Sequence, residues 1–135
     1  LMGRPYRING HVVKGRGIGK TIGWPTANLE VDGRKFLPNI GVYSAWSKIN
    51  NQGLKLPSVM NLGPQPTIDP NSPSAIEVHI INQSIELGGC ELTVEPIKRL
   101  RGQKRFDSIE ELSNQIALDS QSAIESLNLK ENYDF

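Results

Sequence analysis

The chain has 135 residues, a length that suits one domain with its own hydrophobic core. Its formal net charge is +1, which gives no electrostatic reason to expect a nucleic-acid or membrane partner. The single cysteine, Cys90, excludes an intramolecular disulfide and a cysteine-based metal site. No apolar run is long enough to cross a bilayer and no signal peptide is found, so we expect a soluble, cytoplasmic protein.

Short runs of alternating apolar residues, separated by Gly, Pro and Asn, occupy the chain from about residue 6 to residue 100 and predict β-strands. The expected strands carry Ile8, Val12 and Val13; Ala27, Leu29 and Val31; Val42 to Ile49; Leu54 to Leu62; Ile76, Val78 and Ile80; and Leu92 and Val94. Asn50-Asn51-Gln52-Gly53 is expected to be a hairpin turn, and Pro96 a bulge or an edge position. Because no helical pattern intervenes, a closed or nearly closed antiparallel barrel is favoured over a parallel sheet.

The period changes to that of a helix from about residue 108 to residue 127. One apolar stripe contains Ile109, Leu112, Ile116, Ala123, Ile124 and Leu127. Ser108 followed by Glu111 is a capping box, and such a cap stabilises a helix by about 1 kcal/mol. We expect this helix to cover one side or one end of the barrel.

A glycine-rich segment, Gly15-Arg16-Gly17-Ile18-Gly19-Lys20-Thr21, follows the first expected strand. The Walker pattern needs four residues between its first Gly and the Gly-Lys pair, whereas three stand here. Pro25 also disfavours the helix that a phosphate loop must open, and nothing completes the dinucleotide fingerprint. Two interpretations remain, an anion-contacting backbone segment or a glycine-rich hairpin with two solvated charges, and this segment alone favours the second.

The next residues, Gly23-Trp24-Pro25-Thr26-Ala27-Asn28, resemble the signature of riboflavin kinases, including the kinase module of bacterial bifunctional FAD synthetases. Further matches keep the family's order and spacing from Gly3 to about Ala123. They are Gly3-Arg4-Pro5-Tyr6, Leu37-Pro38, Gly41-Val42-Tyr43, Asn61-Leu62-Gly63, Pro66-Thr67, Glu77-Val78-His79, and Arg101 to Phe106 with the capped helix. The resemblance implies one riboflavin kinase domain over residues 1–135, built as a six-stranded antiparallel Greek-key β-barrel with a C-terminal helix. It also implies transfer of the γ-phosphate of ATP to the 5′-hydroxyl of riboflavin, giving FMN and ADP.

The same resemblance implies roles for individual residues. Glu77 would be the general base that accepts the proton of the riboflavin hydroxyl. Mg²⁺ would be held against the ATP phosphates by Thr26 and Asn28, which both offer hard oxygen donors. ATP would also contact Gly15, Lys20 and Asn82. The flavin would contact Arg101, Lys104 and Phe106.

Without the resemblance, each of these residues has a plainer interpretation. Glu77 would be a surface glutamate on a barrel strand. Thr26 and Asn28 would be turn residues that follow a proline. Arg101 and Lys104 would belong to a solvated basic turn, and His11 and His79 are interpreted as structural in either case.

Three places depart from the family's pattern. Asn82-Gln83 stand where an aspartate and an aromatic residue are usual, and Gly88-Gly89 where a tyrosine precedes a glycine. The resemblance puts this region on the adenine side of the ATP site, so stacking surface is lost there. Gln103 replaces the glutamate of an Arg-x-Glu-x-x-Phe segment, which removes a charge near the flavin. None of these positions carries the proposed chemistry.

Two other functions stay open from the sequence. A non-catalytic flavin-binding or regulatory module on the same barrel is disfavoured because a binder has no need for a base at Glu77. An oligonucleotide-binding barrel is disfavoured because the three Phe, two Trp and three Tyr residues form no visible cluster among the strands.

The expected partners are therefore riboflavin and ATP, with no nucleic acid and no membrane. Leu1 to Tyr6 resemble the junction after the adenylyltransferase domain of bifunctional enzymes, which makes a linked N-terminal FMN adenylyltransferase domain a candidate in the full-length protein.

Overall fold

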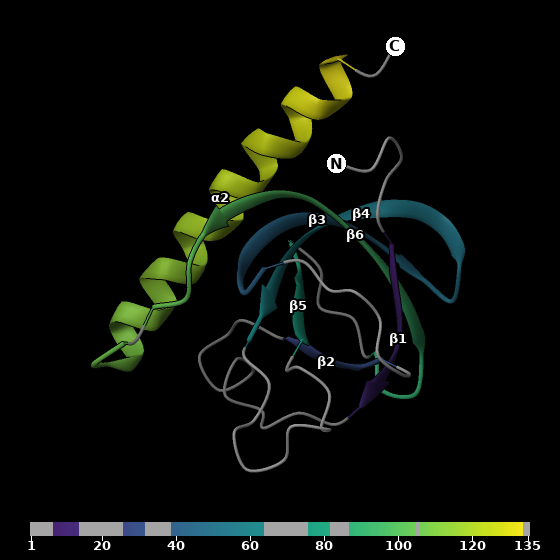
Figure 1. Cartoon of the computed structure of the whole chain (residues 1–135), viewed down its shortest axis with the longest axis horizontal. Coiled ribbons are helices and arrows are strands. Elements are labelled where there is room, and N and C mark those ends of the chain that lie inside the picture. Colours follow the sequence, from purple (N-terminus) through teal and green to yellow (C-terminus); the bar gives the residue numbers. More distant parts are fainter. Residues whose placement is uncertain are drawn as a thin grey trace.

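The computed structural model describes residues 7–13, 26–31, 39–63, 76–81, 87–104 and 106–133. These residues form six antiparallel strands followed by one helix (Figure 1). The elements are β1 (Ile8–Val13), β2 (Ala27–Glu30), β3 (Gly41–Ile49), β4 (Gln52–Leu62), β5 (Ile76–Ile80), β6 (Glu91–Arg101) and α2 (Ile109–Tyr133).

The strands close into a barrel in the order β1-β2-β5-β4-β3-β6. β3, β4 and β5 are consecutive antiparallel neighbours, and β6 returns by a longer connection to lie beside β3, which is a Greek key. Pairing of β1 with β6 completes the closure. The six-stranded Greek-key barrel expected from the family resemblance is confirmed.

Alternate side chains of every strand fill the interior of the barrel. The interior cluster contains Ile8, Val12, Ala27, Leu29, Tyr43, Ala45, Met60, Leu62, Ile76, Val78, Ile80, Leu92 and Val94. Two serines share this interior, and the Ser58 Oγ donates a hydrogen bond of 2.8 Å to the Ser47 Oγ. The two serine hydroxyls are paired with each other, so they can be buried among apolar side chains. The interior of the barrel is therefore a packed core.

The turn between β3 and β4 is tighter than the sequence suggests. Asn50 and Asn51 both have left-handed backbones, with φ of 50° and 55°, which is the signature of a two-residue type I′ turn. Ile49 pairs with Gln52, so β4 begins two residues before the expected start at Leu54. The hairpin prediction is confirmed, with a longer second strand.

The helix α2 lies on the outer surface of the barrel, along one side rather than over an end (Figure 1). It packs against β3, β4 and β6. The contact is made by Val42, Val59, Ile81 and Ala123, with Leu100 and Ile124 at its margin. This apolar contact shields part of the outer face of β3, β4 and β6 from solvent.

The start of α2 is capped as predicted. The backbone N–H of Glu111 donates to the Ser108 Oγ at 3.1 Å, and the Glu111 Oε2 accepts from the backbone N–H of Asp107 at 3.1 Å. The helix continues to Tyr133, past the expected end near residue 127.

Candidate active site

Asn28, Glu77 and Asn61 form a continuous polar row across three neighbouring strands. Asn28 of β2 lies opposite Glu77 of β5, and Glu77 lies opposite Asn61 of β4. Directly opposed side chains of antiparallel strands have Cβ atoms about 4.5–5.5 Å apart. The residues on either side of each in its own strand are buried, so the row faces outward, with Glu77 and Asn61 exposed and Asn28 half-buried.

The alternation of β5 fixes the direction of Glu77. Ile76 and Val78 are 2% and 1% exposed in the interior, so the carboxylate between them points out of the barrel, as predicted. His79, next on the outer face, is buried, in agreement with a structural role.

Thr26 and Asn28 offer oxygen atoms of the kind that Mg²⁺ prefers. Thr26 is exposed and immediately precedes β2, and its spacing from Asn28 directs both side chains to one face of an extended segment. In the part of the chain that the structure describes, no three His, Cys, Asp or Glu residues gather into a metal cage. A hydroxyl and an amide beside a carboxylate suit an ion held mostly by phosphate oxygens and water, which is the usual state of Mg²⁺.

The three predicted flavin residues lie together where β6 ends. The Arg101 Cζ lies 6.0 Å from the centroid of the Phe106 ring, and the Lys104 Nζ lies 5.9 Å from the same centroid. Both distances fall within the range of cation–π attraction. We call residues 101–104 and 106 the flavin segment.

Arg101 is anchored to the helix by a buried carboxylate. Its Nε and Nη2 donate to the two carboxylate oxygens of Asp119 at 2.9 and 2.8 Å, and its Nη1 donates to the carbonyl of Gly102 at 2.9 Å. Gln115 also donates to Asp119, at 3.0 Å. Because three of the five N–H groups of Arg101 have partners in the protein, Lys104 is the freer cation of this segment.

Gln103 connects the flavin segment to the polar row. Its Nε2 donates a hydrogen bond of 2.8 Å to the Oδ1 of Asn61, the residue opposite Glu77. The predicted base, one predicted metal ligand and the predicted flavin residues therefore occupy one connected region on the outside of the barrel.

Comparison with known proteins identifies the family. The family model described as flavokinase, or riboflavin kinase, matches residues 2–127. The chain belongs to the riboflavin kinase family. It is 38% identical over 127 residues to the bifunctional riboflavin kinase/FMN adenylyltransferase of Bacillus subtilis, covering 92% of this chain and 39% of that protein. It is also 38% identical over 130 residues to the enzyme of the same name from Escherichia coli K12, covering 96% of this chain and 40% of that protein.

A solved structure agrees with the fold of this riboflavin kinase domain. It is a crystal structure described as a macrolide-efflux protein from Streptococcus pneumoniae, 32% identical, with a TM-score of 0.81 over 90% of this chain and 39% of that one. Among the described residues of the present chain, no helix has the length and apolar character needed to span a membrane. The kinase domain thus spans about two-fifths of each of these relatives.

Several predicted positions lie outside the residues that the structure describes. They include three of the predicted ATP contacts, Gly15, Lys20 and Asn82, and the departure at Gln83. Gly88 is described and is exposed, in a turn whose next residue, Gly89, donates its N–H to the carbonyl of Val12 at 3.3 Å.

Two residues next to the candidate site, Asn61 and Asp119, have no role in the predictions made from the sequence. Asn61 was noted only as part of a motif, because its place beside Glu77 depends on the register of β4 against β5. Asp119 was missed altogether, although a signal was available. It stands three residues after Ile116 and four before Ala123, so it falls on the apolar stripe of the helix, where an acid needs a buried partner.

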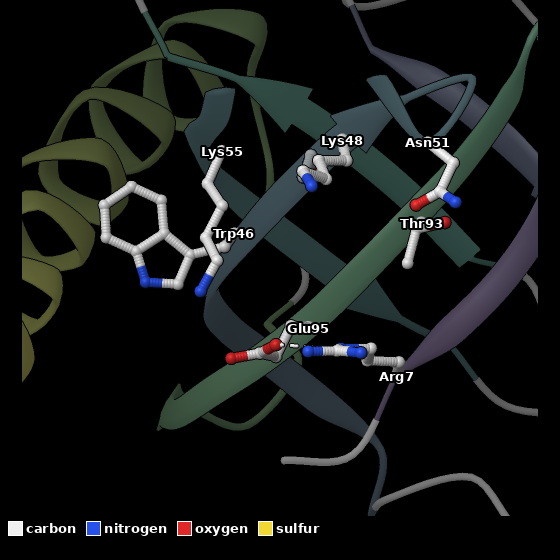
Figure 2. Close-up of a pocket in the computed structure, with 8 residues that line it drawn as sticks. Arg7, Trp46, Lys48, Asn51, Lys55, Thr93 and Glu95 are labelled. Carbon is white, nitrogen blue, oxygen red and sulfur yellow. Dashed lines mark hydrogen bonds and ion pairs between the residues drawn. The ribbon is translucent and has the colours of Figure 1, made fainter. Parts of the chain in front are cut away.

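A hollow on another part of the barrel wall contains none of the predicted site residues. Its lining comes mainly from β3, β4 and β6 and includes Trp46, Lys48 and Lys55 (Figure 2). Among the residues that line it, the Arg7 Nε donates to the Glu95 Oε2 at 3.2 Å (Figure 2). Because none of the predicted site residues lines it, this hollow is a weaker candidate for the kinase site than the polar row.

Proposed function

We propose that this domain transfers the γ-phosphate of ATP to the 5′-hydroxyl of riboflavin, giving FMN and ADP. The observation that carries the proposal is the pairing of Asn28 with Glu77 on one barrel face, next to the flavin segment, in a chain of the riboflavin kinase family. Phosphoryl transfer needs positioning and charge neutralisation more than covalent chemistry, and a small polar site of this kind can supply both.

Glu77 acts as the general base in this proposal. As the riboflavin oxygen bonds to the γ-phosphorus, its proton passes to the carboxylate of Glu77 and the bond from phosphorus to the β–γ bridging oxygen breaks. ADP leaves with the electron pair of that bond. The exposure of Glu77 leaves room for both substrates to approach.

Thr26 and Asn28 would hold Mg²⁺ in this proposal, because their side chains offer a hydroxyl and an amide oxygen. When bound, the ion neutralises charge on the ATP phosphates. Asn28 lies directly opposite Glu77, so a residue that would hold the ion and the residue that would accept the proton are cross-strand neighbours. Gly15, Lys20 and Asn82 are proposed as further ATP contacts.

On the flavin side, Lys104 and the remaining N–H groups of Arg101 face the polar edge of the isoalloxazine. Phe106 offers its plane to the same ring system. The two cations near Phe106 keep this short segment compact around its aromatic ring.

Incubation of the purified chain with riboflavin, Mg²⁺ and ATP, followed by chromatography, tests the proposal. FMN and ADP in equal amounts are expected, with none formed when EDTA removes the metal. Riboflavin that binds to the protein but is never phosphorylated would contradict the proposal and favour a flavin-binding module without catalysis.

A further inference from the structure

The flavin segment is tied at two points to different parts of the fold. Arg101 is held by Asp119 of α2, and Gln103 is held by Asn61 of β4. Lys104 and Phe106, the parts of the segment that we expect to meet the flavin, follow these two ties in the chain. The two ties therefore decide where the flavin ring can sit.

The tie to the helix is the stronger of the two. Asp119 is 6% exposed and accepts a bidentate, charge-assisted pair from Arg101 plus a third hydrogen bond from Gln115. Bidentate Arg–carboxylate pairs fix orientation as well as distance. Since α2 is packed on the barrel through Ala123 and Leu127, Asp119 gives the start of the flavin segment a fixed position.

The tie to β4 is weaker and more exposed than the tie to the helix, but it lies next to the predicted base. Asn61 is the cross-strand neighbour of Glu77, so Gln103 is placed one side chain away from the predicted base. A shift in this contact changes the spacing between the flavin segment and the base without disturbing the barrel interior.

We infer that Asp119 and Asn61 are positioning residues that hold the flavin segment at a set distance from Glu77. Asp119 keeps the segment ordered so that it can bind riboflavin, and Asn61 aligns the bound riboflavin hydroxyl with the base. The inference rests on the proposed function, and it separates two effects: loss of the Asp119 tie weakens riboflavin binding, whereas loss of the Asn61 tie slows the chemical step.

Asp119→Asn tests the helix tie. The replacement keeps the shape but ends the bidentate pair, so we expect the KM for riboflavin to rise about tenfold with kcat within about twofold of wild type. In the free protein, amide hydrogen exchange at Gly102 to Lys104 should become at least about tenfold faster. Glu125→Gln, the same charge change at an exposed position of the helix, should alter neither quantity. Gln115→Leu, a milder disturbance, should move both in the same direction by less.

Gln103→Leu and Asn61→Leu test the tie to β4. Each should lower kcat by about tenfold with the KM for riboflavin within about threefold, because misalignment at a reacting centre is costly. The double variant should be no worse than either single variant if the two side chains act through one contact. Gln121→Leu, at an exposed position on the helix, serves as the control.

Each half can fail separately. One contradicting result is an Asp119→Asn protein that loses thermal stability while its KM for riboflavin and its exchange rates stay unchanged. That result would show that the Arg101–Asp119 pair only fastens the helix to the barrel and does not position the flavin segment. Additive losses in the Asn61 and Gln103 double variant would overturn the second half. If the wild-type chain made no FMN, the proposed function would fail, while the exchange rates at Gly102 to Lys104 would still show whether Asp119 holds the segment.

Discussion

The carboxylate of Glu77 lies between two amide side chains, those of Asn28 and Asn61, on the outside of the barrel. We expect Glu77→Gln to lower kcat by about 10²- to 10⁴-fold while the KM values change little, since the replacement is nearly isosteric and removes only the base. Steady-state kinetics at saturating substrates measures this. Glu30→Gln, an exposed carboxylate on β2, should keep full turnover, and wild-type turnover in the Glu77 variant would remove it from the mechanism.

Thr26 and Asn28 make a separate prediction about the metal. Thr26→Ala and Asn28→Ala each delete an oxygen ligand, so each should raise the Mg²⁺ concentration needed for half-maximal activity, by several-fold or more. A Mg²⁺ titration at fixed ATP gives the value. Asn114→Ala, an exposed asparagine on the helix, is the matched control. An unchanged metal requirement in both variants would exclude them from the metal site.

Gly88 tests the proposed adenine side of the ATP site. A Cβ added at Gly88 meets nothing within 4 Å among the described residues, and its turn adjoins the end of β1, where Val13 pairs with Asn28. Gly88→Tyr should therefore fold normally and tighten ATP binding, because stacking on a base is worth roughly 1–3 kcal/mol in nucleic-acid complexes. Calorimetry measures the ATP affinity of the variant. An affinity equal to or weaker than that of the wild type would place this turn away from adenine.

At the scale of elements, the cap of α2 gives a stability prediction. Ser108→Ala removes the acceptor for the N–H of Glu111 and should lower the free energy of unfolding by about 1 kcal/mol. Urea denaturation measures the loss. Ser122→Ala, in the exposed middle of the helix, should be close to neutral, and equal losses in the two variants would show that the cap is unimportant.

The strands and the helix could be predicted because each buries one face. Ile76, Val78 and Ile80 alternate since the barrel interior accepts every second side chain of β5. Pro96, expected at a bulge or an edge, does sit beside a shift in the register of β3 against β6. The helix end was placed too early, because periodicity marks the residues that pack and Leu127 is the last of these in the predicted stripe.

Strand order and register could not be read from the sequence. Asn28 and Glu77 are far apart in the chain and become neighbours only through the pairing of β2 with β5. Their proposed roles depend on the family resemblance. Without it, Glu77 is interpreted as a surface glutamate and Asn28 as a turn residue that follows a proline. Asn61 needed the register of β4, whereas Asp119 could have been found from its position on the helical stripe.

At the scale of the whole molecule, the domain should act alone on riboflavin. The kinase family model accounts for residues 2–127, and the described strands form one closed barrel against which the helix packs. We therefore expect FMN to accumulate and no FAD to form when the chain is incubated with excess ATP for a long time. The adenylyltransferase activity in the names of the relatives would then belong to the part of those proteins that this chain does not match.

Chromatography with authentic FMN and FAD standards distinguishes the outcomes. A matched reaction that receives a separate FMN adenylyltransferase should convert the same FMN onward, which shows that conditions permit the second step. FAD made by the pure chain would place both activities within it and contradict the assignment of a kinase domain alone to this chain.

The closure of the barrel also governs when a site can exist during synthesis on the ribosome. β1 leaves the exit tunnel first, yet one of its two neighbours is β6, the last strand to be made. A nascent chain that has not reached β5 carries Asn28 but has no base to set against it. Pairing between segments that are distant in the chain is the slow part of folding such a topology, so we expect the local hairpin of β3 and β4 to form before the polar row assembles. Chains that end before β5 therefore lack the pairing of Asn28 with Glu77, and we expect the proposed activity only from a barrel with all six strands.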